Sequence, residues 1–105
     1  MESPGQFIYV VRPTRLEMLT AGPTPEEDAI VGAHFEYLKE LAEKGTVLLV
    51  GRTQNNDGST FGLCIFEAGS EEEAREIMNR DPAVDRGVMN AELFPYRIAI
   101  KGVRL

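Results

Sequence analysis

The sequence predicts an α+β domain of the ferredoxin-like type, in which a four-stranded antiparallel sheet carries two helices on one face. Two observations predict this fold. Four apolar runs typical of β-strands and two amphipathic helical patterns follow one another in the order β-α-β-β-α-β. The chain has 105 residues, which is the length of one domain with its own core, so we expect a single domain over residues 1–105.

The first strand is predicted at residues 6–11, where aromatic and β-branched residues follow one another with little polar alternation. Arg12-Pro13 ends this strand, because proline cannot donate a hydrogen bond to the next strand. The segment 13–24 is then predicted as a loop. Loops of this length in small domains are typical of lids and binding loops.

The first helix is predicted from Thr24 to about Lys44. Thr24 and Glu27 have the spacing of a capping box, Pro25 occupies the first helical position, and Gly45 suits the left-handed residue after the helix. The apolar residues of this segment share one face at helical spacing: Ile30, Tyr37, Leu38 and Leu41.

Two strands follow, at residues 46–50 and 60–67, joined by a hairpin loop over 51–59. The loop contains Asn55-Asn56-Asp57-Gly58, which is a turn signature. The second of these strands is apolar on both faces, with Phe61, Leu63 and Ile65 on one side and Cys64 and Phe66 on the other.

A second capping box, Ser70 with Glu73, begins a helix that is predicted to end near Arg80, with Ala74, Ile77 and Met78 facing the core. The last strand is predicted over 90–100. Because Pro95 would interrupt a central strand, this strand is placed at an edge of the sheet. The expected topology likewise puts the first and third strands at the centre.

Two helices cover only one face of a four-stranded sheet, so the other face would expose a large apolar area. We therefore expect a homodimer in which the two sheets pack face to face. The last strand or the C-terminal segment 101–105 would then lie against the partner and contribute to its pocket.

Composition excludes several classes of function. The chain is 43% hydrophobic and 27% charged, as in globular proteins, and its net charge of −6 has the wrong sign for nucleic-acid binding. No apolar run reaches the roughly 18 residues of a membrane span. The first residues show no secretory signal, so a cytoplasmic protein is expected.

Cysteine and histidine usage narrows the chemistry further. One cysteine, Cys64, excludes an internal disulfide and a cysteine-rich zinc site, and one histidine, His34, excludes a multi-histidine metal site. Cys64 lies among apolar residues and is interpreted as a core residue rather than a nucleophile. No dinucleotide or phosphate-binding glycine loop is present, so neither a cofactor nor a metal is expected.

Several segments together resemble the YciI-like (YCII-related) family, over roughly residues 29–100. The resemblance rests on the order and spacing of these segments: 33–41, 45–51, 57–60, 65–68, 70–74, Asp81-Pro82 and Gly87-Val88. It implies a ferredoxin-like fold that dimerises as an α/β-barrel. Gly51-Arg52 stands where that family commonly has Gly-Pro, and Val31-Gly32-Ala33 departs from its usual segment before the histidine.

The resemblance also implies a catalytic pair formed by a histidine on the first helix and an aspartate before proline, which match His34 and Asp81. A histidine beside a carboxylate can accept and return protons near neutral pH, and the carboxylate fixes its tautomer. Structural roles compete with this interpretation. His34 lies on the apolar side of its helix and Asp81 precedes a proline at a helix end, where aspartate is a frequent turn initiator.

Three further residues are candidates for binding a substrate. Arg12 and Arg52 end the first two strands, and an arginine at a pocket rim suits a carboxylate or phenolate. Ser59 begins the third strand, where its hydroxyl would bind a ligand or close the turn. The alternative is that both arginines are ordinary solvated charges and that Ser59 belongs to the turn.

Two functional hypotheses follow from the sequence. The first is a cofactor-independent acid–base enzyme, resembling a lyase or isomerase, that acts on a small anionic or phenolic molecule through His34 and Asp81. The second is a dimeric module that binds a small ligand without turnover. A distance above about 7 Å between His34 and Asp81 would rule out the pair, because a hydrogen bond requires about 2.6–3.2 Å.

Overall fold

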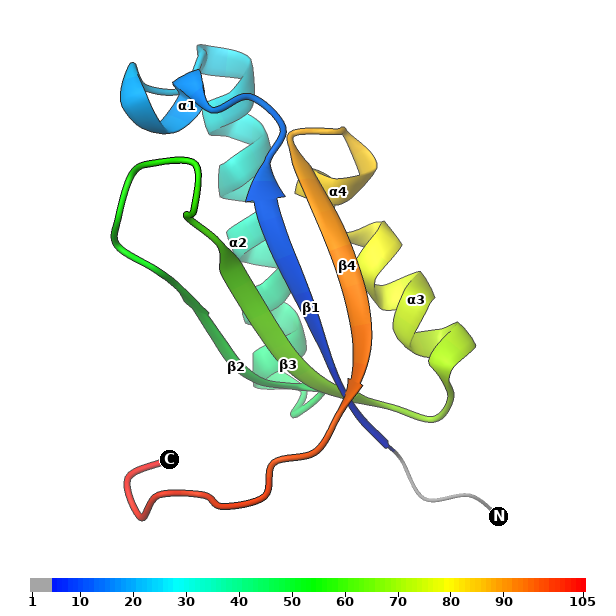
Figure 1. The fold of residues 1–105 in the computed structure, drawn as a ribbon. Helices are drawn as coiled ribbons and strands as arrows, with labels where there is room; N and C mark the ends of the chain where they lie inside the picture. Colours follow the sequence, from blue (N-terminus) through cyan, green and yellow to red (C-terminus); the bar gives the residue numbers. More distant parts are fainter. Residues whose placement is uncertain (1–4) are drawn as a thin grey trace.

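The structure is a computed structural model that describes residues 5–105. Residues 1–4 lie outside the described residues, and so does the part of two predictions that concerns them: the domain over residues 1–105 and the N-terminus without a secretory signal. The chain forms one four-stranded sheet with helices (Figure 1). The elements are β1 (Gly5–Pro13), α1 (Glu17–Thr20), α2 (Pro25–Glu43), β2 (Val47–Arg52), β3 (Gly62–Ala68), α3 (Glu71–Arg80), α4 (Pro82–Asp85) and β4 (Met89–Tyr96). The predicted α+β fold of the ferredoxin-like type is confirmed.

The strands of the sheet lie in the order β2-β3-β1-β4, and every neighbouring pair is antiparallel. The central positions of β1 and β3 agree with the predicted topology. Pro95 of β4 pairs with Phe7 of β1. Its missing N–H is harmless because β4 has a partner on one side only.

The signals at the ends of helix α2 are present as predicted. The Thr24 side chain accepts a hydrogen bond from the Glu27 N–H, the Glu27 side chain accepts one from the Thr24 N–H, and Pro25 begins the helix. Gly45 follows the helix with φ of 84°, a left-handed conformation that glycine adopts without steric cost. The capping box of α3 is only half formed, because Glu73 bonds the Gly69 N–H instead of that of Ser70.

Three local predictions were wrong. The segment 13–24 is not all loop, since it contains the short helix α1, and a second short helix, α4, follows Asp81. Helix α4 forms because the Asp81 side chain accepts a hydrogen bond from the Ala83 N–H while Pro82 takes the first helical position. Strand β4 ends at Tyr96 rather than near 100, because Tyr96 pairs with Gln6 close to the start of β1.

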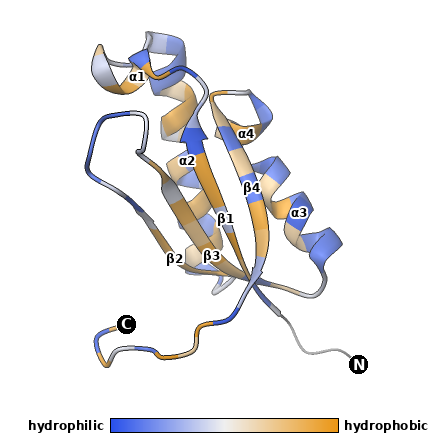
Figure 2. Ribbon diagram, viewed as in Figure 1, coloured by the Kyte–Doolittle hydropathy of each residue, from blue (hydrophilic) through white to orange (hydrophobic). Residues whose placement is uncertain are grey.

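The hydrophobic core lies between one face of the sheet and the helices α2 and α3, both of which lie behind the sheet in Figure 1. It contains Phe7, Tyr9, Val11, Cys64 and Phe66 from the sheet and Leu38, Ala74 and Met78 from the helices. Figure 2 shows β1 coloured as hydrophobic over most of its length and the outer turns of α3 as hydrophilic. A second cluster, formed by Met18, Ile30, Ala83 and Val88, packs α1 against α2 and α4.

The opposite face of the sheet, which we call the open face, is apolar at its centre. Ile8 pairs with Ile65 and Val10 pairs with Leu63 across β1 and β3. On the neighbouring strand β4, Phe94 is 45% exposed. The segment 13–24 does not cover this face, because Met18 packs on the helical side of the sheet. Within residues 5–105 no helix packs on the open face, where Ile8, Val10 and Leu63 are half-buried and Ile65 is buried among its neighbours.

Candidate functional site

His34 and Asp81 lie in direct contact. His34 projects from the middle of α2 and Asp81 is the N-cap residue of α4, and both side chains are buried. The Nδ1 atom of His34 lies 2.7 Å from Oδ1 and 2.8 Å from Oδ2 of Asp81. The contact joins residues 47 apart in the chain and meets the distance required for a proton relay. The structure thus brings the predicted pair together.

Asp81 is held by further hydrogen bonds. The Tyr9 hydroxyl donates to Oδ2 at 2.8 Å, and the Ala83 N–H donates to Oδ1 at 3.0 Å. Each carboxylate oxygen therefore has one donor besides His34, so the imidazole faces a carboxylate whose rotation is fixed at both oxygens. These bonds compensate a carboxylate that has 0% of its surface exposed.

Tyr9 is the member of this network that the sequence interpretation missed. Burial raises the pKa of the Tyr9 phenol well above its ordinary value, and the nearby Cys64 and Asp81 raise it further. The phenol therefore stays protonated and always has a hydrogen to donate. A signal was present in the sequence: Tyr9 alternates with Phe7 and Val11 on the helical face of β1, which puts a polar hydroxyl in the core beside the helix that carries His34.

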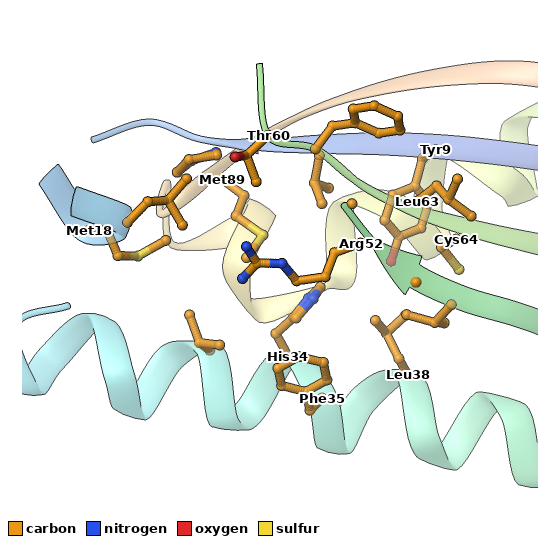
Figure 3. Close-up of a pocket in the computed structure, with 18 residues that line it drawn as sticks. Tyr9, Met18, His34, Phe35, Leu38, Arg52, Thr60, Leu63, Cys64 and Met89 are labelled. Carbon is orange, nitrogen blue, oxygen red and sulfur yellow. The ribbon is translucent and has the colours of Figure 1, made fainter. Parts of the chain in front are cut away.

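His34 lines a cavity of about 210 Å³ between α2, the ends of β1 to β3, and α1 (Figure 3). An engineered apolar cavity of about 150 Å³ accommodates benzene, so a cavity of this size suits a ligand with a single substituted ring. Because Nδ1 faces Asp81, Nε2 is the nitrogen that His34 has left for a ligand. The lining is mainly apolar and includes Val11, Met18, Leu19, Phe35, Leu38, Phe61, Leu63 and Met89.

Arg52 is the basic residue that lines the cavity. It ends β2, and its guanidinium donates to the Thr53 carbonyl at 2.8 Å and to Asn56 Oδ1 at 3.0 Å. These bonds hold the side chain along its own loop, and Figure 3 shows Arg52 between Met89 and His34. Thr60 also lines the cavity, but its hydroxyl is engaged by the Asn55 carbonyl and the Asp57 N–H.

The other two predicted binding residues lie outside this cavity. Arg12 projects from the open face, where it lies 3.6 Å from Glu92 and stacks over the Phe61 ring at 5.6 Å. The Ser59 hydroxyl bonds Asp57 and accepts from Asn55 Nδ2 at 2.7 Å, which closes the hairpin loop. Within one chain, neither side chain reaches the His34 cavity.

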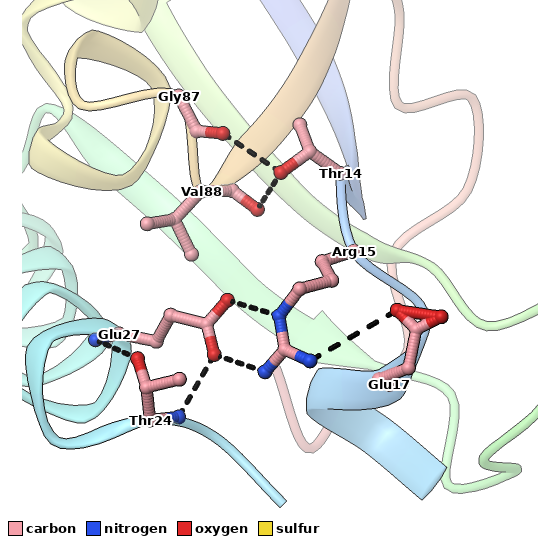
Figure 4. A network of polar contacts seen from close by, with 7 residues as sticks. All are labelled: Thr14, Arg15, Glu17, Thr24, Glu27, Gly87 and Val88. Carbon is pink, nitrogen blue, oxygen red and sulfur yellow. Dashed lines mark hydrogen bonds and ion pairs between the residues drawn. The ribbon is translucent and has the colours of Figure 1, made fainter. Parts of the chain in front are cut away.

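The segment 14–22 closes one end of the cavity with Met18 and Leu19. Figure 4 shows how this segment is anchored. Arg15 Nε donates to Glu27 Oε2 at 2.9 Å, and the Thr14 hydroxyl donates to the Gly87 carbonyl at 2.8 Å. The hydrogen bond from Arg15 and those from Thr24 lower the pKa of Glu27 to about 2.

The remaining titratable groups of residues 5–105 give no alternative centre. Burial raises the pKa of the Cys64 thiol to about 12, so the thiol is neutral at physiological pH and a weak nucleophile. Within residues 5–105, no group of three or more His, Cys, Asp and Glu side chains is arranged to hold a metal ion. Over the same residues, no helix is both long enough and apolar enough to cross a membrane.

Comparison with known proteins identifies a family and shows solved structures of similar fold. The model of the YCII-related domain family matches residues 9–97. A solved structure of a 5-chloro-2-hydroxyhydroquinone dehydrochlorinase (TftG) from Burkholderia phenoliruptrix AC1100, in complex with 2,5-dihydroxybenzoquinone, is similar with a TM-score of 0.61 and 20% sequence identity. The match covers 87% of this chain and 93% of that one, and it shows a shared fold. Comparison with curated proteins gives no match.

Proposed function

The chain belongs to the YCII-related domain family, and we propose that it is a cofactor-independent acid–base enzyme whose proton-transferring group is His34. The proposal rests mainly on the 2.7 Å contact between His34 Nδ1 and Asp81 Oδ1. His34 also lines the cavity. One ring nitrogen is thus held by a carboxylate while the ring borders a space of ligand size, which is the arrangement a general base requires.

In the proposed mechanism, Nε2 of His34 takes a proton from a hydroxyl or an activated C–H of the ligand. The resulting imidazolium is stabilised by Asp81, whose carboxylate keeps its hydrogen bonds from Tyr9 and Ala83 and so remains the acceptor of the Nδ1 proton. His34 then returns its proton to another ligand atom or to a leaving group. Proton removal and return account for an isomerisation, and loss of the leaving group completes an elimination.

The cavity supports a small aromatic ligand. Its apolar side chains suit the faces of one ring, and Arg52 suits an anionic substituent such as a phenolate or carboxylate. The structural relative with the same fold acts on a chlorinated hydroxyhydroquinone, which is a molecule of this class. We therefore propose small phenolic, hydroquinone or lactone compounds as substrates, and the lyase or isomerase class as the reaction.

The experiment is a screen with detection of proton transfer. The wild-type protein is incubated in D₂O with a panel of small phenols, hydroquinones, halogenated analogues and lactones, and mass spectrometry records deuterium uptake or loss of a leaving group. The same reactions with His34→Gln should show no turnover, while Glu72→Gln, a change on the surface of α3, should react as wild type. A compound that reacts equally well with the His34 variant would contradict the proposal.

A ligand-binding module without turnover is the second candidate, and the predominantly apolar lining of the cavity favours it. An apolar cavity binds by burial of ligand surface and needs no general base for this. In the same panel this function would appear as compounds that stabilise the wild type and His34→Gln equally against thermal unfolding, with no chemical change in any of them.

We further propose that the protein is a homodimer formed through the open face. The pairs Ile8–Ile65 and Val10–Leu63 form an apolar centre, and exposed Phe94 adds to it. Burying such an area against an identical face is the simplest symmetric way to cover it. Arg12, which lies on this face, would contribute to a ligand site only across the dimer interface, whereas Ser59 would act by shaping the loop beside Thr60.

The cytoplasmic location remains a proposal. The single thiol, Cys64, is buried and unpaired in a chain that forms no internal disulfide, as is usual for proteins of a reducing compartment. Fractionation of the native cells, followed by detection with an antibody against the chain, would test this, and recovery in a secreted fraction would contradict it.

A further inference from the structure

The C-terminal segment 97–105 is an apolar segment that its own chain leaves uncovered. It follows β4 without forming a helix or strand, and in Figure 1 it runs away from the sheet. Ile100, Val103 and Leu105 are 90%, 103% and 71% exposed. Its contact with the rest of the described chain includes the hydrogen bond from the Ile98 N–H to the Gln6 side chain at 2.8 Å. Three exposed apolar side chains within six residues make this segment a candidate for binding an apolar groove.

A groove of complementary character runs between α2 and the edge strand β2. It is lined mainly by apolar side chains, some of them exposed, such as Phe35 at 54% and Leu48 at 42%. Within residues 5–105, β2 pairs with β3 alone, so the backbone N–H and C=O groups along its other edge are free to bond an extended segment. A strand edge next to apolar pockets is the usual receptor for an extended peptide.

This groove is continuous with the His34 cavity. Phe35, Leu38 and Val50 line both the groove and the cavity. In addition, the Phe35 ring lies edge-on to the His34 imidazole, with 5.2 Å between the ring centroids. A segment bound in the groove would therefore cover the exposed side of Phe35 and form part of the cavity wall.

Charge favours the same pairing. The segment 97–105 carries Arg97, Lys101 and Arg104 and no acidic residue, so it contributes +3 to the net charge of −6 and leaves −9 on residues 1–96. A basic segment is attracted to an acidic body over several ångströms, and the attraction weakens with salt. The attraction acts between the segment and the acidic body as a whole, since Lys39 is the charged residue among those that line the groove.

The arrangement of the sheet favours a second copy as the source of the segment. The segment leaves the sheet from β4, whereas the groove borders β2, and these strands are the two opposite edges of the sheet. We propose that segment 97–105 of a second copy of this chain binds in the α2–β2 groove and completes the wall of the His34 cavity. The inference rests on the proposed dimer, and it adds that each protomer contributes to the other's ligand site.

Site-directed cross-linking tests the proposal on the full-length chain. Ile100→Cys and Leu48→Cys are made in separate chains, one of them isotopically labelled, mixed and oxidised. Both positions are exposed and the native Cys64 is buried, so the new thiols are the reactive ones. We expect a disulfide between the two kinds of chain. The control replaces Leu48→Cys with Glu76→Cys on the exposed side of α3 and should give about tenfold less product. A tenfold preference corresponds to about 1.4 kcal/mol.

A second measurement examines the charges. The variant combines Arg97→Glu, Lys101→Glu and Arg104→Glu in the same polypeptide. Its dimer dissociation constant should be about tenfold or more above that of the wild type and should no longer depend on salt. A dimer that forms no Ile100–Leu48 disulfide above the control would overturn the inference and leave the proposed dimer intact. A disulfide within a single chain carrying both cysteines, but none between chains, would also overturn it. Neither result bears on turnover by His34, which the substrate screen measures separately.

Discussion

Tyr9 and His34 bind the same carboxylate from opposite sides of the core, one from β1 and one from α2, and neither is adjacent to Asp81 in the sequence. The Tyr9 hydroxyl lies 2.8 Å from Oδ2 and His34 Nδ1 lies 2.7 Å from Oδ1. Since Asp81 also caps α4, three elements meet at one buried group. The site is therefore part of the fold's architecture, and substitutions in it affect stability as well as chemistry.

Replacing Asp81 with asparagine should change the tautomer of His34. The amide presents an NH₂ group on one side, so it no longer provides two acceptor oxygens for the Nδ1 proton, and we expect the Nε2–H tautomer to gain population. Turnover of any substrate found in the screen should fall by about 10²–10⁴-fold, the range typical of general acid–base catalysis. Because the chain has one histidine, ¹⁵N NMR reports this tautomer without ambiguity. An unchanged imidazole spectrum would show that Asp81 does not set the tautomer.

Replacing Tyr9 with phenylalanine should destabilise the protein by about 1–3 kcal/mol, since it leaves a buried carboxylate oxygen with one donor fewer. The ring remains packed against Phe66, whose centroid is 5.6 Å away, so the loss isolates the hydroxyl. Urea unfolding measures the difference in the free energy of unfolding. Tyr37→Phe is the matched control, because its hydroxyl donates to the Ile77 carbonyl on the half-exposed side of the core. A loss for Tyr9→Phe no larger than for this control would argue against a special role for the Asp81 bond.

The sequence was sufficient for the fold because the signals were local. Thr24, Pro25 and Gly45 mark the ends of α2 through contacts within a few residues, and period-two apolar runs mark the strands. The prediction that His34 and Asp81 form a pair rests on a resemblance to a family and not on periodicity, because no local pattern brings together residues 47 apart in the chain. Helix α4 depends on the hydrogen bond that the Asp81 side chain accepts from Ala83, and an Asp-Pro pair in a sequence is equally typical of a turn.

The cavity residues were harder to predict than the pair for a physical reason. Which side chains of β2, β3 and α1 meet around His34 depends on the packing of α1, and α1 is fixed by Arg15 with Glu27 and by Thr14 with the turn before β4. These contacts join separate segments. Arg12 was predicted from its position at a strand end, but strand alternation sends its side chain to the open face together with Glu92.

The Arg15–Glu27 pair predicts a stability loss in acid. The pKa of Glu27 is lowered to about 2 from its ordinary value of 4.5. A carboxyl with a lowered pKa stabilises the fold fully above its unfolded pKa, and this contribution is lost as the pH falls from about 4.5 toward about 2. Urea unfolding at pH 7 and at pH 3 should show Glu27→Gln losing less stability between the two values than the wild type. Glu26→Gln, one position earlier in α2, serves as control and should follow the wild type. Equal losses in all three proteins would contradict this role of the pair.

The last prediction tests the proposed dimer and depends on a difference in burial between Phe61, just before β3, and Phe66, within β3. Phe66 is fully buried in the protein's own core, whereas Phe61 lies under Arg12 on the open face and is partly exposed. Phe61→Asp therefore tests the open face without placing a charge in the cluster around Phe66, and because Phe61 also lines the His34 cavity the readouts are solubility and mass rather than ligand binding. Because the half-buried apolar side chains of this face, such as Val10 and Leu63, would lose the partner that covers them, we expect an insoluble or unfolded protein rather than a folded monomer. The measurements are soluble yield and, for the wild type, the mass in solution by light scattering at micromolar concentration. A wild-type protein of monomeric mass, or a soluble and folded Phe61→Asp monomer, would show that the open face needs no partner.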